Sequence, residues 1–303
     1  MVKLAIAVDL GASHIRVALG DNKGKIITKI KETTVTVGSI SQQILRMVKL
    51  ILATNNKKIQ GMGVGTVGPL DTKRNMVINS ANLTVSEVRF NDLKQLGLPI
   101  YLLNDANAAA FGEKHFGLGK NVDNLVYITL SSGIGTGAIV DGHLLSGKEE
   151  NAAEMGHAIV DTTYNLPCGC QKGVGHWESL ASGRNIPRFF KKWLGQRKVD
   201  FKVTTENIFA EANNGNKLVL SFIEELGKIN SRGIYNLIRA YGPELITIGG
   251  SVAVNNKKLI LEPILRNIPQ FKKLPEIKIT QLGDDIGLLG ALAAVFNKVG
   301  TLI

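Results

Sequence analysis

Two segments of the chain repeat one pattern, and this repeat constrains the fold more than any other feature. Residues 3–9 and 15–20 are apolar runs joined by a short turn, and an Asp and a Gly follow them. Residues 125–130 and 138–140 have the same arrangement around a Gly-rich segment. Short apolar runs between turn residues are typical of strands. The repeat therefore indicates two similar domains, each opening with a pair of strands.

The rest of the chain alternates between predicted strands and helices. Further strands are expected at 59–65, 99–103 and 244–248, and helices at 39–54, 105–115, 205–240 and 286–297. This alternation predicts an α/β fold, and 303 residues suffice for two domains. We expect a smaller domain over 1–107, with the C-terminal segment 289–303 packed on it, and a larger domain over 108–288.

The chain is basic, with a net charge of +11. A nucleic-acid partner is one explanation, but the Lys residues form short pairs and no long block: Lys57-Lys58, Lys191-Lys192, Lys257-Lys258 and Lys272-Lys273. A solvated basic surface explains such pairs, so we expect no nucleic-acid partner. A composition with 44% hydrophobic and 20% charged residues excludes a disordered chain.

The sequence has no pattern that predicts export or membrane insertion. The N-terminus lacks the basic, apolar and small-residue regions of a signal peptide. No run reaches the roughly 18 apolar residues of a membrane span. We expect a cytoplasmic location and no membrane association.

The first polar motif, Asp9-Leu10-Gly11-Ala12-Ser13-His14-Ile15-Arg16, follows the first predicted strand. Small residues after a strand end let backbone N–H groups approach a phosphate. The carboxylate of Asp9 would hold Mg²⁺ through water, because Mg²⁺ prefers oxygen ligands. An ordinary Asp-containing turn is the alternative.

A Gly-rich segment, Ser131-Ser132-Gly133-Ile134-Gly135-Thr136-Gly137, follows the first strand of the second repeat. Backbone N–H groups in such a turn can bind an anion. The segment lacks the Gly-Lys-Ser/Thr of a Walker A loop, and it leads into a strand and not into the helix of a dinucleotide fingerprint. A plain Gly-rich hairpin is the alternative.

The pair Asn104-Asp105 lies between a predicted buried strand and an Ala-rich helix. An Asp at this position is often only a helix N-cap. The carboxyl end of a strand is also where α/β proteins bind their ligands, and a carboxylate there can accept a proton from an alcohol. Both interpretations fit Asp105.

Two thiols and two imidazoles lie close together in the sequence: His157, Cys168, Cys170 and His176. The two Cys are the only ones in the chain, and a single intervening residue disfavours a disulfide between them. The four side chains complete a tetrahedral zinc set. Reduced core thiols and ordinary His residues are the alternative.

Together, and in this order, these motifs resemble the ROK family of sugar kinases, within the actin/hexokinase-like superfamily. The resemblance covers nearly the whole chain and is carried by Asp9–Arg16, Gly65–Pro69, Asn79–Leu83, Asn104–Ala108, Ser131–Gly137, Ala152–His157, Ile248–Ser251 and Gly283–Ala291. It implies two actin/hexokinase-like (ribonuclease H-like) α/β domains flanking a cleft. It also implies ATP-dependent phosphorylation of the primary hydroxyl of a hexose.

The resemblance assigns roles to individual residues. Asp105 would be the catalytic base, and the sugar would be bound by Gly65, Asn82, Asn104, Asp105, Glu154, His157 and Glu178. ATP would be bound by Asp9, Gly11, Ala12, Ser13, Ser132, Gly133, Gly135, Gly249, Gly250 and Ser251. A structural Zn²⁺ would be bound by His157, Cys168, Cys170 and His176. ATP, Mg²⁺ and a homodimer complete the expectation.

The chain departs from the family pattern at two places. Its first motif has Gly-Ala-Ser in place of Gly-Gly-Thr, which keeps small residues and a hydroxyl. Its metal motif has His176, with one extra loop residue, where a third Cys is usual. His is an equally good zinc ligand, so we expect zinc to be retained.

The sequence leaves the acceptor sugar open. We expect glucose, whereas N-acetylmannosamine, N-acetylglucosamine, mannose or fructose would use much the same residues. A sugar-responsive transcriptional repressor is the alternative from another class. Related repressors carry an N-terminal DNA-binding domain, and here the first strand begins by Lys3. A phosphatase or ATPase on the same scaffold would not need Asn104, Glu154 and His157. We therefore expect a kinase.

Overall fold

A computed structural model describes all residues except 79–82, 86, 172 and 270–272. The chain forms two compact units, each assembled from separate segments. Unit 1 comprises Met1–Val122, Gly137–Ala153 and Leu282–Ile303, and unit 2 comprises Asp123–Thr136 and Glu154–Gln281. The chain therefore crosses between the units at several points, including the peptide bond from Ala153 to Glu154.

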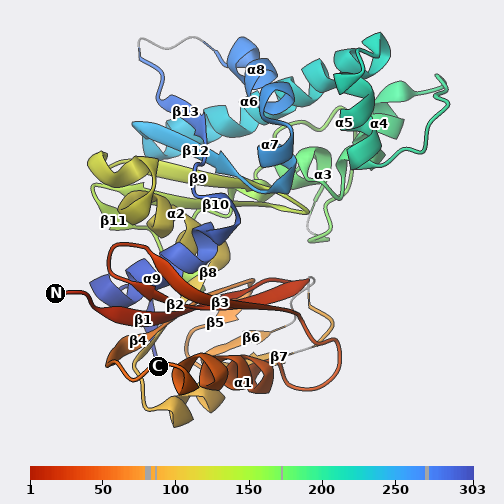
Figure 1. The fold of residues 1–303 in the computed structure, drawn as a ribbon. Coiled ribbons are helices and arrows are strands. Elements are labelled where there is room, and N and C mark those ends of the chain that lie inside the picture. The colour runs from red at the N-terminus through yellow and green to blue at the C-terminus, as the bar shows by residue number, and fades with distance from the viewer. Residues whose placement is uncertain (79–82, 86, 172, 270–272) are drawn as a thin grey trace. The chain divides into compact units, whose positions relative to one another are not determined.

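Unit 1 is built on a six-stranded sheet with the order β14-β8-β4-β1-β2-β3 (Figure 1). The strands are β1 (Leu4–Leu10), β2 (His14–Asp21), β3 (Ile26–Thr33), β4 (Ile59–Thr66), β8 (Ile100–Asn104) and β14 (Thr301–Leu302). Strands β1, β4 and β8 are parallel, and the remaining pairs are antiparallel. A small second sheet contains β5 (Leu70–Asp71), β6 (Met76–Ile78) and β7 (Glu87–Arg89).

Helices pack on both faces of the larger sheet, as the alternation of side-chain size along β1 requires. Ile6 and Val8 belong to a core shared with α1 (Ile40–Ala53), whose N-cap Ser39 accepts a hydrogen bond from Gln42 N. Ala5 and Ala7 point to the other face and pack in a core with α9 (Ile286–Asn297). The small Ala side chains on that face let α9 approach the sheet closely.

Helix α2 (Asp105–Phe116) packs against α9 with backbone almost touching backbone. A Cβ atom built on Gly290 would lie 1.6 Å from the carbonyl oxygen of Ala108, and one on Gly112 would lie 2.7 Å from that of Ile286. A Cβ on Gly63 in β4 would lie 1.9 Å from the carbonyl oxygen of Ala291. Glycine is therefore required where these elements meet.

Unit 2 contains parallel strands β9 (Leu125–Leu130), β12 (Leu245–Gly249) and β13 (Glu276–Ile279), with β12 in the middle. Strand β10 (Ile134–Val140) begins in unit 2 and continues into unit 1, where it pairs with β11 (His143–Leu144). The helices are α3 (Trp177–Ala181), α4 (Ile186–Leu194), α5 (Thr205–Asn213), α6 (Lys217–Tyr241), α7 (Ser251–Asn255) and α8 (Lys257–Asn267). Short 3₁₀ turns occur in both units: η1 (Phe90–Leu96), η2 (Leu118–Asn121), η3 (Lys148–Glu150), η4 (Met155–His157) and η5 (Gly283–Asp285).

The long helix α6 organises the packing of unit 2. Phe222 on α6 contacts the rings of Phe189 and Phe190 on α4. Buried Trp177 donates a hydrogen bond of 2.8 Å from Nε1 to Asn230 Oδ1, also on α6. This pair satisfies both polar groups inside the core and fixes α3 against α6.

The predicted α/β fold is confirmed, with two differences in extent. Unit 1 reaches Val122, beyond the predicted boundary at residue 107, because α2 packs on α9 of the same unit. It also includes residues 137–153 and 282–288, which the sequence had assigned to the larger domain. The predicted Gly-rich turn over 131–137 is shorter, since β10 already begins at Ile134 and buries both Ile134 and Thr136. Among the described residues, no helix combines the length and apolar character that a membrane crossing needs.

Candidate functional site

One group of candidate site residues lies at the carboxyl edge of the parallel strands in unit 1. Asp9 in β1 is in register with Gly65 in β4, and Thr66 in β4 is in register with Asn104 in β8. The pairing of three parallel strands therefore brings these residues to one edge, which is where open α/β sheets bind ligands.

Asp9 is a buried carboxylate held by Arg16. The two residues are opposite each other on β1 and β2, and the Arg16 guanidinium forms an ion pair with Asp9 Oδ2. The same guanidinium donates to the carbonyl oxygen of Asp284, which ties β2 to η5. Burial raises the pKa of Asp9, and Arg16 opposes that rise.

Asp105 is the first residue of α2, and Asn104 is the N-cap. Asn104 Oδ1 accepts a hydrogen bond of 2.9 Å from Ala106 N, and Asp105 Oδ1 accepts one of 2.8 Å from the same group. Capping is therefore shared, and Asp105 keeps part of its surface accessible. Burial raises the pKa of Asp105 to about 6, the charge of Asp9 adds to the rise, and the Ala106 N–H opposes it.

The predicted phosphate turn after β1 is exposed at its tip. Gly11 N donates a 3.0 Å hydrogen bond to the carbonyl oxygen of His14, which closes the turn around Ala12 and Ser13. Thr34 anchors the turn, with its Oγ1 donating to Gly11 O at 2.9 Å and its N donating to Ser13 O at 3.0 Å. Ala12 and Ser13 are left exposed to solvent.

A second group of candidate site residues lies at the carboxyl edge of the parallel strands in unit 2. Thr129 in β9 is in register with Gly249 in β12, so the turns that follow the two strands start at the same edge. Gly250 has φ +85°, and a Cβ atom there would lie 2.4 Å from the carbonyl oxygen of Leu130. Ser251 is exposed at the start of α7. These predicted ATP-binding residues therefore gather within unit 2.

Glu178 supports the turn Ser131–Gly133. Its Oε2 accepts a 3.0 Å hydrogen bond from Ile134 N, and a Cβ atom on Gly133 would lie 2.8 Å from the same oxygen. Ser131 N closes the turn on Gly133 O at 3.0 Å. Ser132, at the tip, is exposed. In unit 2 the carboxylate of Glu178 thus contacts the predicted phosphate turn.

Two predicted glycines lie inside strands, and one predicted residue is outside the described part of the chain. Gly135 lies within β10 and not in a turn. Gly65 is buried, and a Cβ atom there would lie 3.1 Å from Ala108 Cβ on α2. Asn82 lies outside the described residues. Glu154 is exposed and immediately precedes η4.

The four predicted metal ligands come together in unit 2. The ligand atoms of His157, Cys168, Cys170 and His176 all lie within 4.8 Å of one another. Cys168 Sγ lies 3.6 Å from His157 Nδ1, and Cys170 Sγ lies 3.5 Å from His176 Nδ1. Tetrahedral zinc with bonds of about 2.3 Å to sulfur and about 2.1 Å to nitrogen separates S and N by about 3.6 Å. The donor set therefore fits zinc in both chemistry and spacing.

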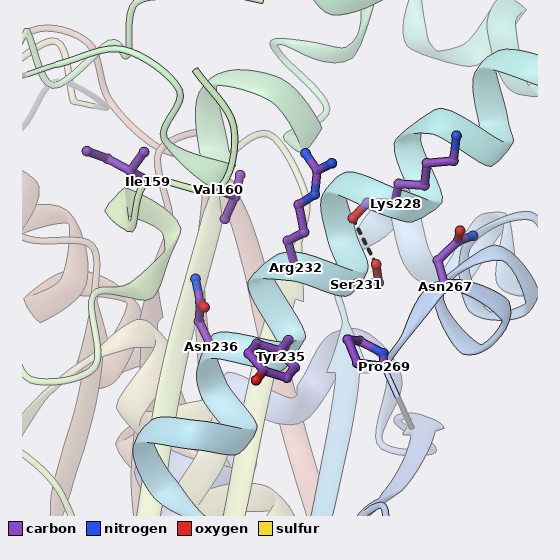
Figure 2. A pocket seen from close by; sticks show the side chains of 9 residues that line it. All are labelled: Ile159, Val160, Lys228, Ser231, Arg232, Tyr235, Asn236, Asn267 and Pro269. Atoms are coloured by element: carbon purple, nitrogen blue, oxygen red, sulfur yellow. Dashed lines mark hydrogen bonds between the residues drawn. The ribbon is translucent and has the colours of Figure 1, made fainter. Parts of the chain in front are cut away.

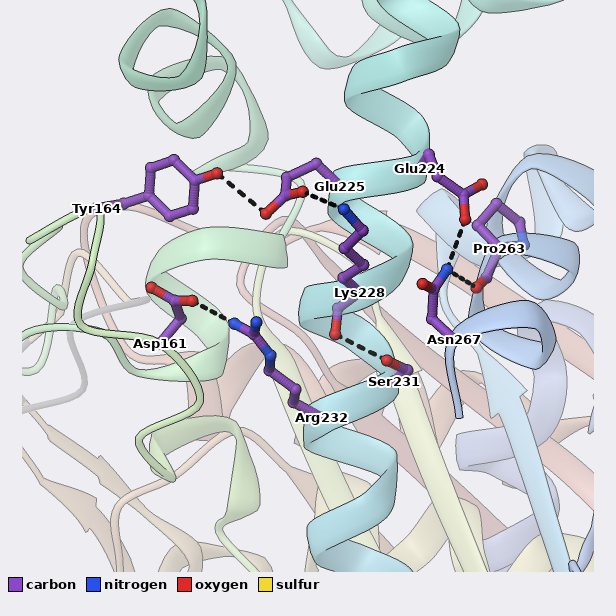
Figure 3. A network of polar contacts seen from close by, with 9 residues as sticks. All are labelled: Asp161, Tyr164, Glu224, Glu225, Lys228, Ser231, Arg232, Pro263 and Asn267. Atoms are coloured by element: carbon purple, nitrogen blue, oxygen red, sulfur yellow. Dashed lines mark hydrogen bonds and ion pairs between the residues drawn. The ribbon is translucent and has the colours of Figure 1, made fainter. Parts of the chain in front are cut away.

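Ion pairs and hydrogen bonds attach the segment between these ligands to α6 (Figure 3). Arg232 forms an ion pair with Asp161. Tyr164 donates a 3.0 Å hydrogen bond to Glu225, whose other oxygen lies 3.0 Å from Lys228 Nζ. Because His176 is the N-cap of α3, this attachment also bears on the position of Glu178 two residues later.

A cavity of about 420 Å³ lies on the α6 side of this segment (Figure 2). Its lining includes Ile159, Val160, Arg232 and Tyr235. None of the residues that line it is among the predicted site residues.

The sequence of this chain is similar to those of known proteins over nearly its whole length. The ROK family model matches residues 5–298. The chain belongs to the ROK family. It is 32% identical over 300 residues to a glucokinase of Pyrobaculum calidifontis, covering 98% of this chain and 96% of the relative. It is 28% identical to a xylose repressor of Caldicellulosiruptor bescii, covering 97% of this chain and 78% of the relative.

Solved structures of ROK proteins share the fold. A ROK hexokinase from Thermus thermophilus superposes with a TM-score of 0.82 at 27% identity, covering 97% of this chain and 98% of the other. A ROK glucokinase from Streptomyces griseus, solved with glucose and AMPPNP, has a TM-score of 0.75 at 30% identity, covering 95% and 98%. The family and the fold that the sequence predicted are confirmed.

Sequence reasoning missed one polar residue near Asp105. Glu150 is buried, and its Oε2 accepts a 3.2 Å hydrogen bond from Asn107 Nδ2 in the first turn of α2. Burial raises the pKa of Glu150, and hydrogen bonds from Asn107 and Ser146 oppose the rise. In the sequence, Glu149-Glu150-Asn151 has the composition of an exposed loop, so no pattern marks Glu150 as buried.

The raised pKa of Asp105 predicts a stability gain when its charge is removed. A carboxyl group whose pKa is higher in the folded than in the unfolded protein stabilises the fold below its unfolded pKa, and this contribution is lost as the pH rises through about 6. Asp105→Asn should therefore raise the free energy of unfolding at pH 7.5 by roughly 1–3 kcal/mol, and by little at pH 4. Denaturant unfolding at both pH values measures this. Exposed Asp200→Asn is the control, and an Asp105→Asn variant no more stable than wild type at pH 7.5 would refute the burial of this charge.

Proposed function

We propose that this protein is an ATP-dependent hexose kinase that phosphorylates the primary hydroxyl of glucose. The observation that carries the proposal is the partly accessible Asp105 carboxyl, whose pKa is raised to about 6, at the carboxyl edge of β8. A group of this pKa is ionised at neutral pH and can still accept a proton. Relatives named glucokinase, aligned over nearly the whole chain, support the same activity.

Asp105 acts as the base in the proposed reaction. Its carboxylate accepts a hydrogen bond from the primary hydroxyl and takes the proton as the hydroxyl oxygen bonds to the γ-phosphorus of ATP. The bond between that phosphorus and the β,γ-bridging oxygen breaks, and ADP leaves. Phosphoryl transfer passes through a loose transition state, so most of the catalysis comes from positioning and charge stabilisation. Capping by Asn104 supplies positioning, because it fixes the backbone on which Asp105 stands.

The residues around Asp9 fit a magnesium ion bound together with ATP. Asp9 and Asp105 are close enough for the charge of Asp9 to raise the pKa of Asp105, and a cation would relieve this repulsion. When bound, Mg²⁺ neutralises phosphate charge. Arg16 holds Asp9 in place, and the backbone N–H groups of the exposed residues Ala12 and Ser13 can donate to phosphate oxygens.

Zinc would have a structural role in this proposal. His157, Cys168, Cys170 and His176 supply four ligands, which leaves no open position for a reacting group. His176 is followed by α3, which carries Glu178. His157 is the last residue of η4, and η4 begins directly after Glu154. An ion at this cluster would fix the backbone three residues after Glu154 and two residues before Glu178. We propose that these two carboxylates bind sugar hydroxyls.

The relatives also include repressors, so a regulatory function is the alternative to a kinase. The xylose repressor exceeds the matched region, since this chain covers only 78% of it. The proposed base Asp105, its cap Asn104 and the carboxylate Asp9 are all present here and meet at one sheet edge, which favours catalysis. A dimer, the absence of a nucleic-acid partner and a cytoplasmic location stay predictions.

Coupled ADP-release assays with glucose, mannose, fructose, N-acetylglucosamine and N-acetylmannosamine test the activity. We expect the highest kcat/KM with glucose. Asp105→Asn should lower kcat by at least about a hundredfold, within the range of a lost general base, while glucose binding measured by calorimetry survives. The exposed Asp200→Asn variant should match wild type. Turnover of Asp105→Asn close to wild type would rule out the assigned base, and no sugar-dependent ADP release from wild type would rule out the kinase.

Metal analysis of the purified protein tests the zinc cluster. We expect about one zinc per chain, since four ligands converge on one point. Cys170→Ser should lose most of the metal and lower the midpoint of thermal unfolding, whereas His176→Cys should keep both. The control is His143→Ala, an exposed His outside the cluster. Zinc in Cys170→Ser equal to wild type would show that the ion is bound elsewhere.

A further inference from the structure

The segment from Gly147 to Ala153 holds an unusual backbone conformation next to the catalytic helix. Glu149, Glu150 and Ala153 have φ values of +57°, +58° and +61°. Residues other than Gly adopt this region at a cost of about 1–3 kcal/mol each, and they persist there only where the surrounding structure enforces it. Contacts of this segment with its surroundings must therefore hold it in place, in addition to its own backbone hydrogen bonds from Asn151 N to Lys148 O and from Ala152 N to Ser146 O.

Glu150 makes the contact that can do so. Its neighbour Glu149 is partly exposed, whereas Glu150 is only 5% exposed. The Oε2 atom of Glu150 accepts a 3.2 Å hydrogen bond from Asn107 Nδ2, and the backbone oxygen of Glu150 lies 3.4 Å from the same nitrogen. Both the side chain and the backbone of Glu150 are thus attached to one amide group.

Within the described part of the chain, the Asn107 side chain makes no other hydrogen bond. It is 1% exposed, and among the described residues its Oδ1 has no hydrogen-bond partner. A buried amide with one unpaired atom already carries a cost of about 1–3 kcal/mol. Loss of the Glu150 side chain would leave the amide with only the longer 3.4 Å contact to the backbone oxygen, so the side chain of Glu150 fixes the orientation of Asn107.

The position of Asn107 connects this pair to the chemistry. Asn107 lies in the first turn of α2, two residues after Asp105. The segment that Glu150 holds ends at Ala153, and the next residue is Glu154, where the chain enters unit 2. The hydrogen bond between Asn107 and Glu150 therefore fixes the first turn of α2, which carries the base. It also fixes the segment that leads to Glu154, the predicted sugar-binding carboxylate.

We propose that Glu150 is a positioning residue for phosphoryl transfer, acting through Asn107 on the first turn of α2. This role rests on the proposed kinase function. Glu150 itself does not contact the reacting atoms in this account. Its effect is to keep Asp105 within reach of the sugar hydroxyl, and small misplacement of a catalytic group costs up to about a hundredfold in rate.

Three variants of Glu150 separate positioning from stability. Glu150→Gln keeps an acceptor for Asn107 and should keep kcat within about threefold of wild type. Such a change is small compared with the loss of rate that misplacement of a catalytic group causes. Glu150→Ala should lower kcat for glucose by between about tenfold and about a hundredfold. Glu150→Gly relieves the backbone strain, so its thermal midpoint should exceed that of Glu150→Ala while its kcat stays equally low. Glu149→Ala, with the same φ but a side chain outside the pair, is the matched control and should match wild-type kcat.

A double-mutant cycle with Asn107→Ala tests the connection between the two residues. If they act as one unit, the double variant should be no slower than either single variant. Wild-type kcat in Glu150→Ala, or losses that multiply in the double variant, would overturn the positioning role while leaving an active kinase. Absence of sugar-dependent ADP release from wild type would instead overturn the proposed function, and this role with it.

Discussion

The contact on which the rest of unit 1 depends is the approach of α2 to α9 and β4, where backbone meets backbone. Gly290, Gly112 and Gly63 lie at this contact, and a methyl group on any of them would overlap a main-chain atom. The two helices can come this close only because the side chains between them are absent. The benefit is a fixed position for the start of α2, and with it for Asn104 and Asp105. A loop could not place a carboxylate at the edge of β8 with the same rigidity.

The charges at that edge are held at a cost to stability. Asp9 and Asp105 are both in surroundings that disfavour their ionised forms, and the charge of Asp9 adds to the rise in the pKa of Asp105. Among the described residues, Asp9 has a basic partner, Arg16, and Asp105 has none. This difference suits their proposed tasks: Arg16 holds Asp9 in place for a bound cation, and Asp105 is a base whose pKa lies near neutral. Carboxyl groups with pKa values perturbed by burial and by neighbouring charges are typical of functional sites.

The helices, the strands and the four metal-binding residues could be predicted from the sequence. The structural roles of individual residues within these elements could be predicted less well. The alternation of Gly with other residues over 131–137 suggested a turn that binds an anion, yet Gly135 lies inside β10, because the burial of its neighbours continues the strand. The metal cluster was predictable because Cys and His are rare and their chemistry is specific. Glu150 was not, since its burial depends on a left-handed backbone and on a partner far away in the sequence. Glu178 was predicted as a sugar ligand, and its contact with Ile134 N could not be read from spacing alone.

The pH dependence of kcat/KM for glucose at saturating ATP and Mg²⁺ tests most directly the central claim, that a buried Asp105 is the base. Protonation of that carboxyl should remove activity, so the profile should fall on the acid side with an apparent pKa of about 6. The residual activity of Asp105→Asn should lack this acid limb. A wild-type profile that stays flat down to about pH 4.5, or the same limb in Asp105→Asn, would contradict the assignment of the base, because an unperturbed Asp titrates near 3.9.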